Sequence, residues 1–397
     1  MHISNLKNQK LNSNFVRNGS DYSELFSERT DFGILTGWKS NLPDDPNWDG
    51  FLDSTPLGQF HQTSKWAQVR ILDGWKPLII IITHADTIVG GFQILVRTKS
   101  HLGKIGLVLK GPVVSSNDAR IVDFVIKALK KMAGSNHINA LIVQPPDRDK
   151  IVPKMLKESG FSKNHLEYVI KNNTVVVDLR DDEAAIFRRV NPSNRNNIRK
   201  AAKNGLSMIE ADKENLTTFF SFMRTSCQRQ NVSPSPSDIK FLQIMWDVFS
   251  RNGNIKLFFS ELNGEFISAQ LLIPFGDTAY LWKFGWSGNH SKFHPNDFLN
   301  WETLKWAKVN GFSYADMGAI DKTTAAQIWS GETLKGEHAK TYSYFKLSFG
   351  GEVMPLTEGF VYICNPLIRG AYNLLMPYIN SKPFLKKKIW SIVNSAK

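Results

Sequence analysis

Three cations follow one another at intervals of four residues in the stretch RRVNPSNRNNIRKAAK. Arg195, Arg199 and Lys203 are expected to share one face of a helix, because residues four apart are neighbours on a helix surface. A ridge of positive charge at this spacing can follow a phosphate backbone. The same pattern is also typical of a solvated helix face. These residues are therefore compatible with two alternatives, an anion-binding ridge or a solvated helix face without a binding role.

A carboxylate stands where a predicted strand ends. The stretch 293–320 contains a predicted helix that opens at Pro295 and closes at Gly311, with apolar residues at helical spacing. Residues 313–317 then form a short predicted strand, which ends in Asp316 and the small residues after it. The carboxylate of Asp316 can orient an attacking amine or accept its proton, or it can cap the loop that follows.

These side chains need elements that hold them, and the chain contains the same series of elements twice. Residues 76–97 and 256–275 each hold two apolar runs around a polar turn, and Asn263-Gly264 is a strong hairpin signal. Each pair is followed by predicted elements at 105–114, 118–132, 140–144 and 151–159 in the first half, and at 279–286, 297–309, 313–317 and 323–329 in the second. The order strand, strand, strand, helix, strand, helix thus recurs after roughly 180 residues, which indicates duplication of one mixed α/β unit. Two such units side by side form a cleft, a favoured place for a small-molecule site.

The composition is that of a globular protein with excess positive charge. The 397 residues, 42% hydrophobic and 12% aromatic, are enough for two domains, each with its own core. The 49 Lys and Arg against 36 Asp and Glu give a net charge of +13, which attracts nucleic acid, anionic lipid or a pyrophosphate without choosing among them. Two cysteines are too few for a disulfide scaffold or a thiolate metal site. We expect no metal and no cofactor.

The same features predict a cytoplasmic protein. No apolar run approaches the roughly 20 residues that span a bilayer. The N-terminus lacks the apolar region of a signal peptide, and the two cysteines fit a reducing compartment.

The motifs Pro-Asn, Trp-Glu, Trp-Ala-Lys, Asn-Gly and Asp-x-Gly follow one another between residues 295 and 318. This series resembles the Fem family, within the Gcn5-related N-acyltransferase (GNAT) superfamily, whose members add amino acids from aminoacyl-tRNA to peptidoglycan precursors. Further similarities lie at 59–75, 195–206 and 344–367. The resemblance implies an α/β fold with mixed α+β sheets, in two tandem GNAT-like domains with a cleft between them. No heptad hairpin lies between residues 205 and 255, so the chain resembles the compact type without a coiled-coil arm.

The stretch FHQTSKWAQVR at residues 60–70 looks like the N-terminal signature of the family. Thr63 can cap a helix in which Trp66 and Val69 face inward, and Arg70 then lies one turn beyond Trp66. By resemblance, Arg70 holds the pyrophosphate of the acceptor, because a guanidinium can bond two phosphate oxygens at once. An exposed helix charge is the alternative. His61 is expected to be structural.

Three more residues take roles from the resemblance. In MRTSCQRQNV the match falls on Arg229, which is expected to face the second half of the same phosphate group. Trp282 and Phe284 stand where the family commonly has tyrosines, on a strand that lines the cleft, so we expect them to bind substrate. Packing in the core is the alternative for this pair.

The stretch YFKLSFGGEV at residues 344–353 resembles the closing strand and turn of the family. On this resemblance Lys346 projects from a strand into the cleft and neutralises the 3′-end phosphate of the tRNA or the developing oxyanion. The family shows Tyr-Asp-Phe-Gly-Gly where this chain has Ala315, Asp316 and then Met-Gly-Ala. Lys346 and Asp316 are the two predicted catalytic residues, and a surface lysine is the alternative for the first.

The predicted domains are an N-terminal extension (1–48), a first GNAT-like domain (49–170), a second GNAT-like domain (171–358) and a basic amphipathic C-terminal segment (359–397). The first ~45 residues are polar and rich in Asn and Ser, which predicts little regular structure there. The last segment interleaves apolar residues with Arg369 and Lys386 to Lys388. Such a segment can contact the inner leaflet of the cytoplasmic membrane, or it can be a docked helix with solvated lysines.

Three functions compete on these grounds. The first is transfer of an amino acid from aminoacyl-tRNA to the side-chain amine of a peptidoglycan precursor that carries a pyrophosphate, with the ridge of residues 195–203 toward the tRNA. The donor ester is already activated, so orientation and charge stabilisation can supply most of the rate. The second is N-acyl transfer to an amino sugar or lipid-linked glycan of surface polysaccharide; it is favoured by the replaced tyrosines and disfavoured because the loop after 279–286 lacks the acyl-CoA pattern. The third is a catalytically silent tRNA- or lipid-binding relative.

Overall fold

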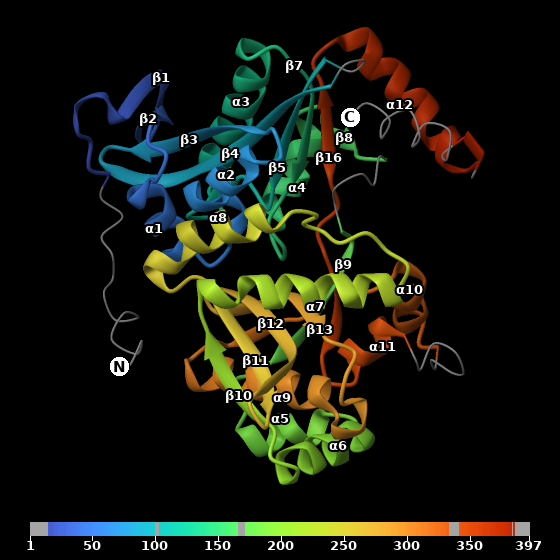
Figure 1. The fold of residues 1–397 in the computed structure, drawn as a ribbon. Helices are drawn as coiled ribbons and strands as arrows, with labels where there is room; N and C mark the ends of the chain where they lie inside the picture. Colours follow the sequence, from blue (N-terminus) through green and yellow to red (C-terminus); the bar gives the residue numbers. More distant parts are fainter. Residues whose placement is uncertain (1–14, 100–102, 166–170, 333–340, 383, 386–397) are drawn as a thin grey trace. The chain divides into compact units, whose positions relative to one another are not determined.

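The computed structural model describes residues 15–99, 103–165, 171–332, 341–382 and 384–385 (Figure 1). The chain divides into two units, each with its own sheet and core. The internal unit holds Asn172–Pro355, and the terminal unit combines the described residues up to Lys171 with those from Leu356 onward. Lys386 to Lys388, on which part of the predicted basic C-terminal segment rests, lie outside the described residues.

The terminal unit is built on one mixed sheet in the order β1-β2-β3-β4-β5-β7-β16-β8, with β6 paired to β4. Its strands are β1 (Tyr22–Thr30), β2 (Gly33–Ser40), β3 (Lys76–His84), β4 (Thr87–Lys99), β5 (Gly103–Leu109), β6 (Val113–Val114), β7 (Ile138–Gln144), β8 (Ser162–Lys163) and β16 (Phe360–Ile363). Neighbours are antiparallel except β5 and β7. Parallel neighbours need a crossover connection, and helix α3 (Ala119–Ser135) supplies it.

Helices cover this sheet because their apolar residues recur on one side. Helix α3 buries Val122, Val125 and Leu129, which belong to the same core as Ile80 and Phe92 of the sheet. Figure 1 shows α3 and α4 beside the strands of this unit. The other helices of the unit are α1 (Pro46–Ser54), α2 (Ser64–Ile71), α4 (Ile151–Glu158) and α12 (Pro366–Asn380).

The internal unit repeats this plan. Its sheet has the order β10-β11-β12-β13-β14-β9-β15, and β13 and β14 are parallel. The strands are β9 (Asn173–Asp178), β10 (Ser207–Ala211), β11 (Lys256–Leu262), β12 (Glu265–Phe275), β13 (Thr278–Trp286), β14 (Tyr314–Asp316) and β15 (Glu352–Pro355). The helices are α5 (Glu183–Arg189), α6 (Pro192–Lys203), α7 (Leu216–Arg229), α8 (Ile239–Phe249), α9 (Pro295–Val309), α10 (Lys322–Trp329) and α11 (Tyr342–Leu347). Short 3₁₀ turns lie at Gly19–Asp21, Phe60–Gln62, Lys213–Asn215, Ser250–Asn252 and Ser291–Phe293.

The predicted duplication is confirmed. The series β3, β4, β5, α3, β7, α4 of the terminal unit matches β11, β12, β13, α9, β14, α10 of the internal unit. The parallel pair also falls at the same place in both sheets. The two pairs differ in length, because β5 follows β7 from Lys104 to Leu109 whereas β13 follows β14 only from Thr278 to Tyr280. The rest of β13 extends past the end of β14.

Both ends of the chain differ from the prediction. Residues 22–54 are not poorly structured: β1 and β2 form a hairpin, β2 pairs with β3, and Leu35 is fully buried. At the other end, β16 pairs with β7 and β8, so residues 360–363 complete the sheet of the terminal unit. The physical reason is the apolar strand Phe-Val-Tyr-Ile, whose Phe360 is 0% exposed.

Among the described residues, no helix combines the length and the apolarity that crossing a bilayer requires.

Replacing Phe360 by Ala tests whether the returning strand is part of the core. We expect the variant to lose about 3–5 kcal/mol of unfolding free energy, because a buried phenyl ring leaves a cavity in a well-packed core. The measurement is urea unfolding followed by circular dichroism. The matched control is Phe384→Ala, since Phe384 is 77% exposed and its loss is expected to change stability by less than about 0.5 kcal/mol. Equal stabilities of the two variants would contradict the assignment of β16 to this core.

Candidate functional site

Helix α2 begins at the predicted cap and ends at Arg70. The side chain of Thr63 accepts a hydrogen bond from the backbone N–H of Trp66 (3.1 Å), and Trp66 and Val69 are buried as expected. The helix is therefore fixed at its start and on its inner face. Its last turn carries Arg70 at the edge of that buried face.

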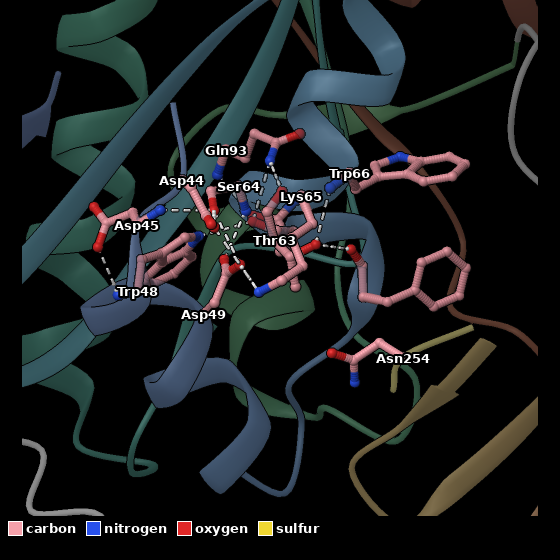
Figure 2. A network of polar contacts seen from close by, with 12 residues as sticks. Asp44, Asp45, Trp48, Asp49, Thr63, Ser64, Lys65, Trp66, Gln93 and Asn254 are labelled. Carbon is pink, nitrogen blue, oxygen red and sulfur yellow. Dashed lines mark hydrogen bonds and ion pairs between the residues drawn. The ribbon is translucent and has the colours of Figure 1, made fainter. Parts of the chain in front are cut away.

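A buried ion pair anchors the first turn of α2 to α1 (Figure 2). Asp49 of α1 accepts hydrogen bonds from the backbone N–H of Ser64 (2.7 Å), from Ser64 Oγ (2.9 Å) and from Lys65 Nζ (3.0 Å). The side chains of Asp49 and Lys65 are only 8% and 10% exposed. Burial raises the pKa of Asp49, while the charge and hydrogen bond of Lys65 oppose that shift. Removal of either partner would leave the other charge buried alone.

Two glutamines tie the same turn to the sheet. Gln62 accepts from the backbone N–H of Gln93 (2.7 Å) and donates to the carbonyl oxygen of Leu109 (2.7 Å). Gln93 in turn donates to the carbonyl oxygen of Thr63 (2.7 Å), as Figure 2 shows in part. The start of α2 is thus bonded to β4 and β5, so Arg70 projects from a rigid base.

Arg70 lies in an aromatic and basic environment. Its guanidinium carbon is 5.8 Å from the ring centroids of both Trp66 and Trp75, and Arg97 lies 6.0 Å from the ring of Trp75. Asp73 pairs with Arg70 Nη1 at 2.9 Å. Burial lowers the pKa of Arg70, Asp73 opposes this shift, and the charge of Arg97 adds to it. Two guanidiniums beside one carboxylate leave net positive charge here, and among the described residues the buried Nε of Arg70 has no hydrogen-bond partner.

His61 borders the same environment, although the sequence reasoning treated it as structural. Its ring centroid lies 3.8 Å from that of Phe60 and 5.6 Å from that of Trp66. Burial, together with the charges of Lys110 and Arg70, lowers the pKa of His61 to about 3. The imidazole is therefore neutral near pH 7, and its buried Nδ1 has no hydrogen-bond partner in the part of the chain that the structure describes. His61 belongs to the stretch 60–70, which resembles the family signature, and this was the feature of the sequence that could have placed it near Arg70.

In the internal unit, Lys346 is on a helix and not on the predicted strand. Helix α11 begins after Thr341, whose side chain accepts from the backbone N–H of Tyr344 (3.2 Å), and the strand β15 comes only after the glycine turn. The side chain of Lys346 is buried and its Nζ donates to the carbonyl oxygen of Ala319 (2.9 Å). The same Nζ lies 4.6 Å from the ring centroid of Tyr342. The prediction of a strand was wrong, but the lysine does reach the loop after β14.

Asp316 ends β14 as predicted, and it caps the loop of residues 316–319. Its carboxylate accepts hydrogen bonds from Thr174 Oγ1 and from the backbone N–H of Gly318 (2.7 Å). Gly318 has a φ of +77°, and a Cβ at this position would lie 3.2 Å from Lys346 Nζ. The glycine therefore permits both the turn and the close approach of the lysine. These two contacts are those of a cap, and a catalytic role for Asp316 stays a prediction.

Trp282 and Phe284 contact different groups, although they are two residues apart on β13. Trp282 stacks on Phe241 of α8 with 6.3 Å between ring centroids, whereas Phe284 packs against the core that contains Leu299 of α9. The reason is a bulge, because the register shifts between Leu271 and Leu272 of β12 where β13 passes Trp282. On a regular strand, residues two apart lie on the same face of the sheet, but the bulge breaks this rule for Trp282 and Phe284. A shared face therefore does not support a shared substrate-binding role for the two residues.

Arg229 ends α7 and covers Trp286. Its Nη2 donates to the carbonyl oxygen of Trp286 (2.9 Å) and to Ser226 Oγ (3.3 Å), and its guanidinium carbon lies 4.3 Å from the Trp286 ring. Partial burial lowers its pKa. Arg229 belongs to the internal unit and Arg70 to the terminal unit. That both grip one pyrophosphate, with Lys346 facing the same groove, stays a prediction.

The basic ridge is the exposed side of helix α6. Arg199 and Lys203 are exposed and Arg195 is half-buried, while Ile198 and Ala201 are buried on the other side. Arg199 lies 5.2 Å from the ring of Phe187. In the described part of the chain no ion pair involves any of the three cations, so their charge is available to a polyanion. Nor do the described residues contain a group of three or more His, Cys, Asp or Glu side chains placed to hold a metal ion.

Two family models match the chain, one within each unit. Residues 44–158 match the FemAB family, and residues 192–325 match the acetyltransferase (GNAT) domain. A lipid II:glycine glycyltransferase of Staphylococcus epidermidis (strain ATCC 35984) is 22% identical over 346 residues, which cover 69% of this chain and 82% of that protein. A protein of the same name from Staphylococcus aureus (strain MRSA252) is 25% identical over 227 residues, or 54% of this chain and 53% of that protein.

Solved structures show the same fold. The crystal structure of FemX matches with a TM-score of 0.73 at 19% identity, over 85% of this chain and 99% of that chain. A tandem GNAT protein from the clavulanic acid biosynthesis pathway matches with a TM-score of 0.50 at 10% identity, over 84% of this chain and 99% of that chain. The prediction of two tandem GNAT-like domains with mixed sheets is thereby confirmed.

The depressed pKa of His61 predicts how stability depends on pH. Between the ordinary pKa of 6.5 and about 3, the unfolded chain binds a proton that the folded chain excludes, so stability falls as the pH drops through this window. From about pH 7 to about pH 5 we expect His61 to account for a loss of about 2 kcal/mol. Urea unfolding of the His61→Asn variant should lack this part of the pH dependence. The control His137→Asn, at an exposed histidine, should keep it, and equal slopes for all three proteins would contradict the assignment.

Proposed function

Because the chain belongs to the FemAB family within the GNAT superfamily, we propose that this acyltransferase moves an aminoacyl group from a tRNA to the amine of a peptidoglycan-precursor stem peptide. The observation that carries the proposal is the similarity, over 346 residues, to proteins named lipid II:glycine glycyltransferase. A cytoplasmic location is part of the proposal, since aminoacyl-tRNA is a cytoplasmic donor.

Arg70 supports the proposed binding of a pyrophosphate-bearing acceptor. A half-buried guanidinium with an unpartnered Nε gains a hydrogen bond when an anion enters, and a charge-assisted bond is stronger than a neutral one. Arg97 adds positive charge 6.0 Å from the ring of Trp75. His61 stays neutral beside these cations, so it would add an acceptor or donor without repelling further charge.

Lys346 supports the proposed transfer step. The acceptor amine attacks the ester carbonyl carbon of the donor; a C–N bond forms and the C–O bond to the tRNA ribose breaks. The amine loses a proton and the ribose oxygen gains one. The Nζ of Lys346, which donates to the carbonyl oxygen of Ala319, would stabilise the negative oxygen that develops on the ester carbonyl. Asp316 would act as a positioning residue, because it fixes the loop on which Lys346 is held.

The ridge on α6 supports a polyanionic donor. Arg195, Arg199 and Lys203 present positive charge on one helix side without ion-pair partners among the described residues. Such contacts position a nucleic acid through its phosphates and carry no sequence preference.

One observation favours a second candidate function. The internal unit matches the acetyltransferase (GNAT) domain model, so N-acyl transfer to an amino sugar or a lipid-linked glycan is the alternative. The two functions differ in their donors. Purified protein is therefore incubated with charged tRNA or with acetyl-CoA, each with lipid-linked and with soluble peptidoglycan precursors, and the products are weighed by mass spectrometry. A mass gain of one aminoacyl unit from tRNA supports the proposal, and an acyl gain from the thioester overturns it.

The variant Lys346→Met tests the role of the ammonium. We expect kcat for aminoacyl transfer to fall by about 100-fold or more, which is the usual cost of removing a group that stabilises an oxyanion. Lys346→Arg keeps the charge and should recover part of the rate. The control Lys213→Met removes a surface lysine that pairs with Asp247, and it should leave kcat unchanged. Full activity of the folded Lys346→Met variant would show that Lys346 has no part in the step.

The variant Arg70→Gln tests the pyrophosphate contact. We expect KM for the pyrophosphate-bearing acceptor to rise by about 10- to 100-fold, because roughly 1.5–3 kcal/mol of charge-assisted hydrogen bonding is lost. The KM for a stem peptide without pyrophosphate should be the same in variant and parent. The control Arg120→Gln removes an exposed arginine that pairs with Asp31 and Asp118. An equal rise in KM for both acceptors would mean that Arg70 acts through the fold and not through the phosphates.

A further inference from the structure

Helix α12 exposes a continuous apolar stripe. Leu367, Leu374 and Tyr378 are 84%, 79% and 61% exposed, and Ile368 and Leu375 beside them are 58% and 51% exposed. Positions 367, 371, 374, 375 and 378 recur with helical spacing, so these side chains share one face. Large aliphatic side chains exposed together in this way mark a surface that binds a partner or a membrane.

The opposite face holds the helix on the terminal unit. Met376 is buried, and the backbone N–H of His165 donates to the hydroxyl of Tyr372 (3.0 Å). Asn380 and His165 Nδ1 are hydrogen-bonded at 2.9 Å. Since residues 372, 376 and 380 are four apart, the docked face and the exposed stripe lie on different sides of the helix. The stripe is therefore presented by a fixed helix.

Charge identifies the partner. From residue 359 to the last residue of the sequence there is no Asp or Glu, whereas Arg369, Lys382, Lys386, Lys387, Lys388 and Lys397 are all basic. Within the described residues, Arg369 lies 4.8 Å from the ring of Tyr362, and Lys382 and Phe384 are exposed just beyond the helix. A second copy of this chain would bring like charges together, whereas a bilayer with anionic lipids is complementary to both the apolar stripe and the cations.

We propose that α12 lies flat on an anionic lipid bilayer, with its apolar stripe at the boundary between headgroups and acyl chains and the exposed Lys382, just beyond the helix, against the headgroups. The helix has 15 residues, fewer than the roughly 20 that span a bilayer, so it lies in the interface and does not cross it. This surface is separate from the residues of the proposed transfer reaction, and the proposal does not depend on that reaction.

Helix α12 is packed against the same core as the residues near Arg70. Tyr372 packs against a small core of the terminal unit that also contains Trp75. Arg70 and Arg97 lie 5.8 Å and 6.0 Å from the ring centroid of Trp75. The helix proposed to contact lipid and the two arginines of the proposed anion site are therefore attached to the same core.

Vesicle sedimentation tests the proposal without any substrate. The full chain is mixed with vesicles of phosphatidylcholine alone or of an equal mixture of phosphatidylcholine and phosphatidylglycerol. We expect binding to the mixed vesicles, weaker binding to phosphatidylcholine, and loss of binding as salt rises because salt screens the cations. The double variant Leu367→Glu, Leu374→Glu should bind the mixed vesicles at least about tenfold more weakly, since it places carboxylates in the apolar stripe.

The control is Val309→Glu, which places a carboxylate at a residue of the internal unit that is 82% exposed. It should bind vesicles like the parent, and all variants should keep the parental melting temperature, because the changed residues are exposed. Equal binding by the double variant, or no binding to anionic vesicles, would overturn the proposal. A parent that is dimeric in solution and becomes monomeric in the double variant would assign the stripe to a second copy instead.

Discussion

The arrangement depends on keeping positive charge partly buried without neutralising it. Burial disfavours a charged side chain, so a cation taken from water must be compensated by other groups. Around Arg70 the compensation comes from two indole rings and a single aspartate, with Arg97 adding a second cation. The Nζ of Lys346 donates to the carbonyl oxygen of Ala319 and lies 4.6 Å from the ring centroid of Tyr342. In both places these contacts orient the side chain.

Such cations need a rigid support, and polar contacts supply it. In the terminal unit the buried Asp49–Lys65 pair and the two glutamines fix the first turn of α2 against α1, β4 and β5. In the internal unit Asp316 holds the loop that Lys346 reaches. Asp49 and Asp316 thus position backbone and helices, whereas Asp73 pairs with Arg70 itself.

Much of the fold could be predicted because it rests on local periodicity. The duplicated series of elements, the helix that carries Arg195, Arg199 and Lys203, the cap at Thr63 and the strand that ends in Asp316 all follow from residue spacing. The errors lie where contacts between distant residues decide. Lys346 sits in a short apolar run that fits a strand as well as a helix turn, and its packing against residues 316–319 selects the helix. The bulge beside Trp282 leaves no signal in β13 itself. The Asp49–Lys65 pair joins residues that nothing in the sequence connects.

After the internal unit, the chain returns to the terminal unit. This return brings α12 into the unit that holds Arg70, although the two are far apart in the sequence. Strand β16 completes the sheet of the terminal unit, and α12 follows it at once, so the last helix is carried by the unit that holds Arg70. A lipid-linked acceptor is confined to the bilayer. An enzyme held at that surface meets such an acceptor at a higher effective concentration than an enzyme free in solution. Because α12 and Arg70 belong to the same unit, anchoring α12 would hold the residue proposed to bind the acceptor near the surface to which a lipid-linked acceptor is confined.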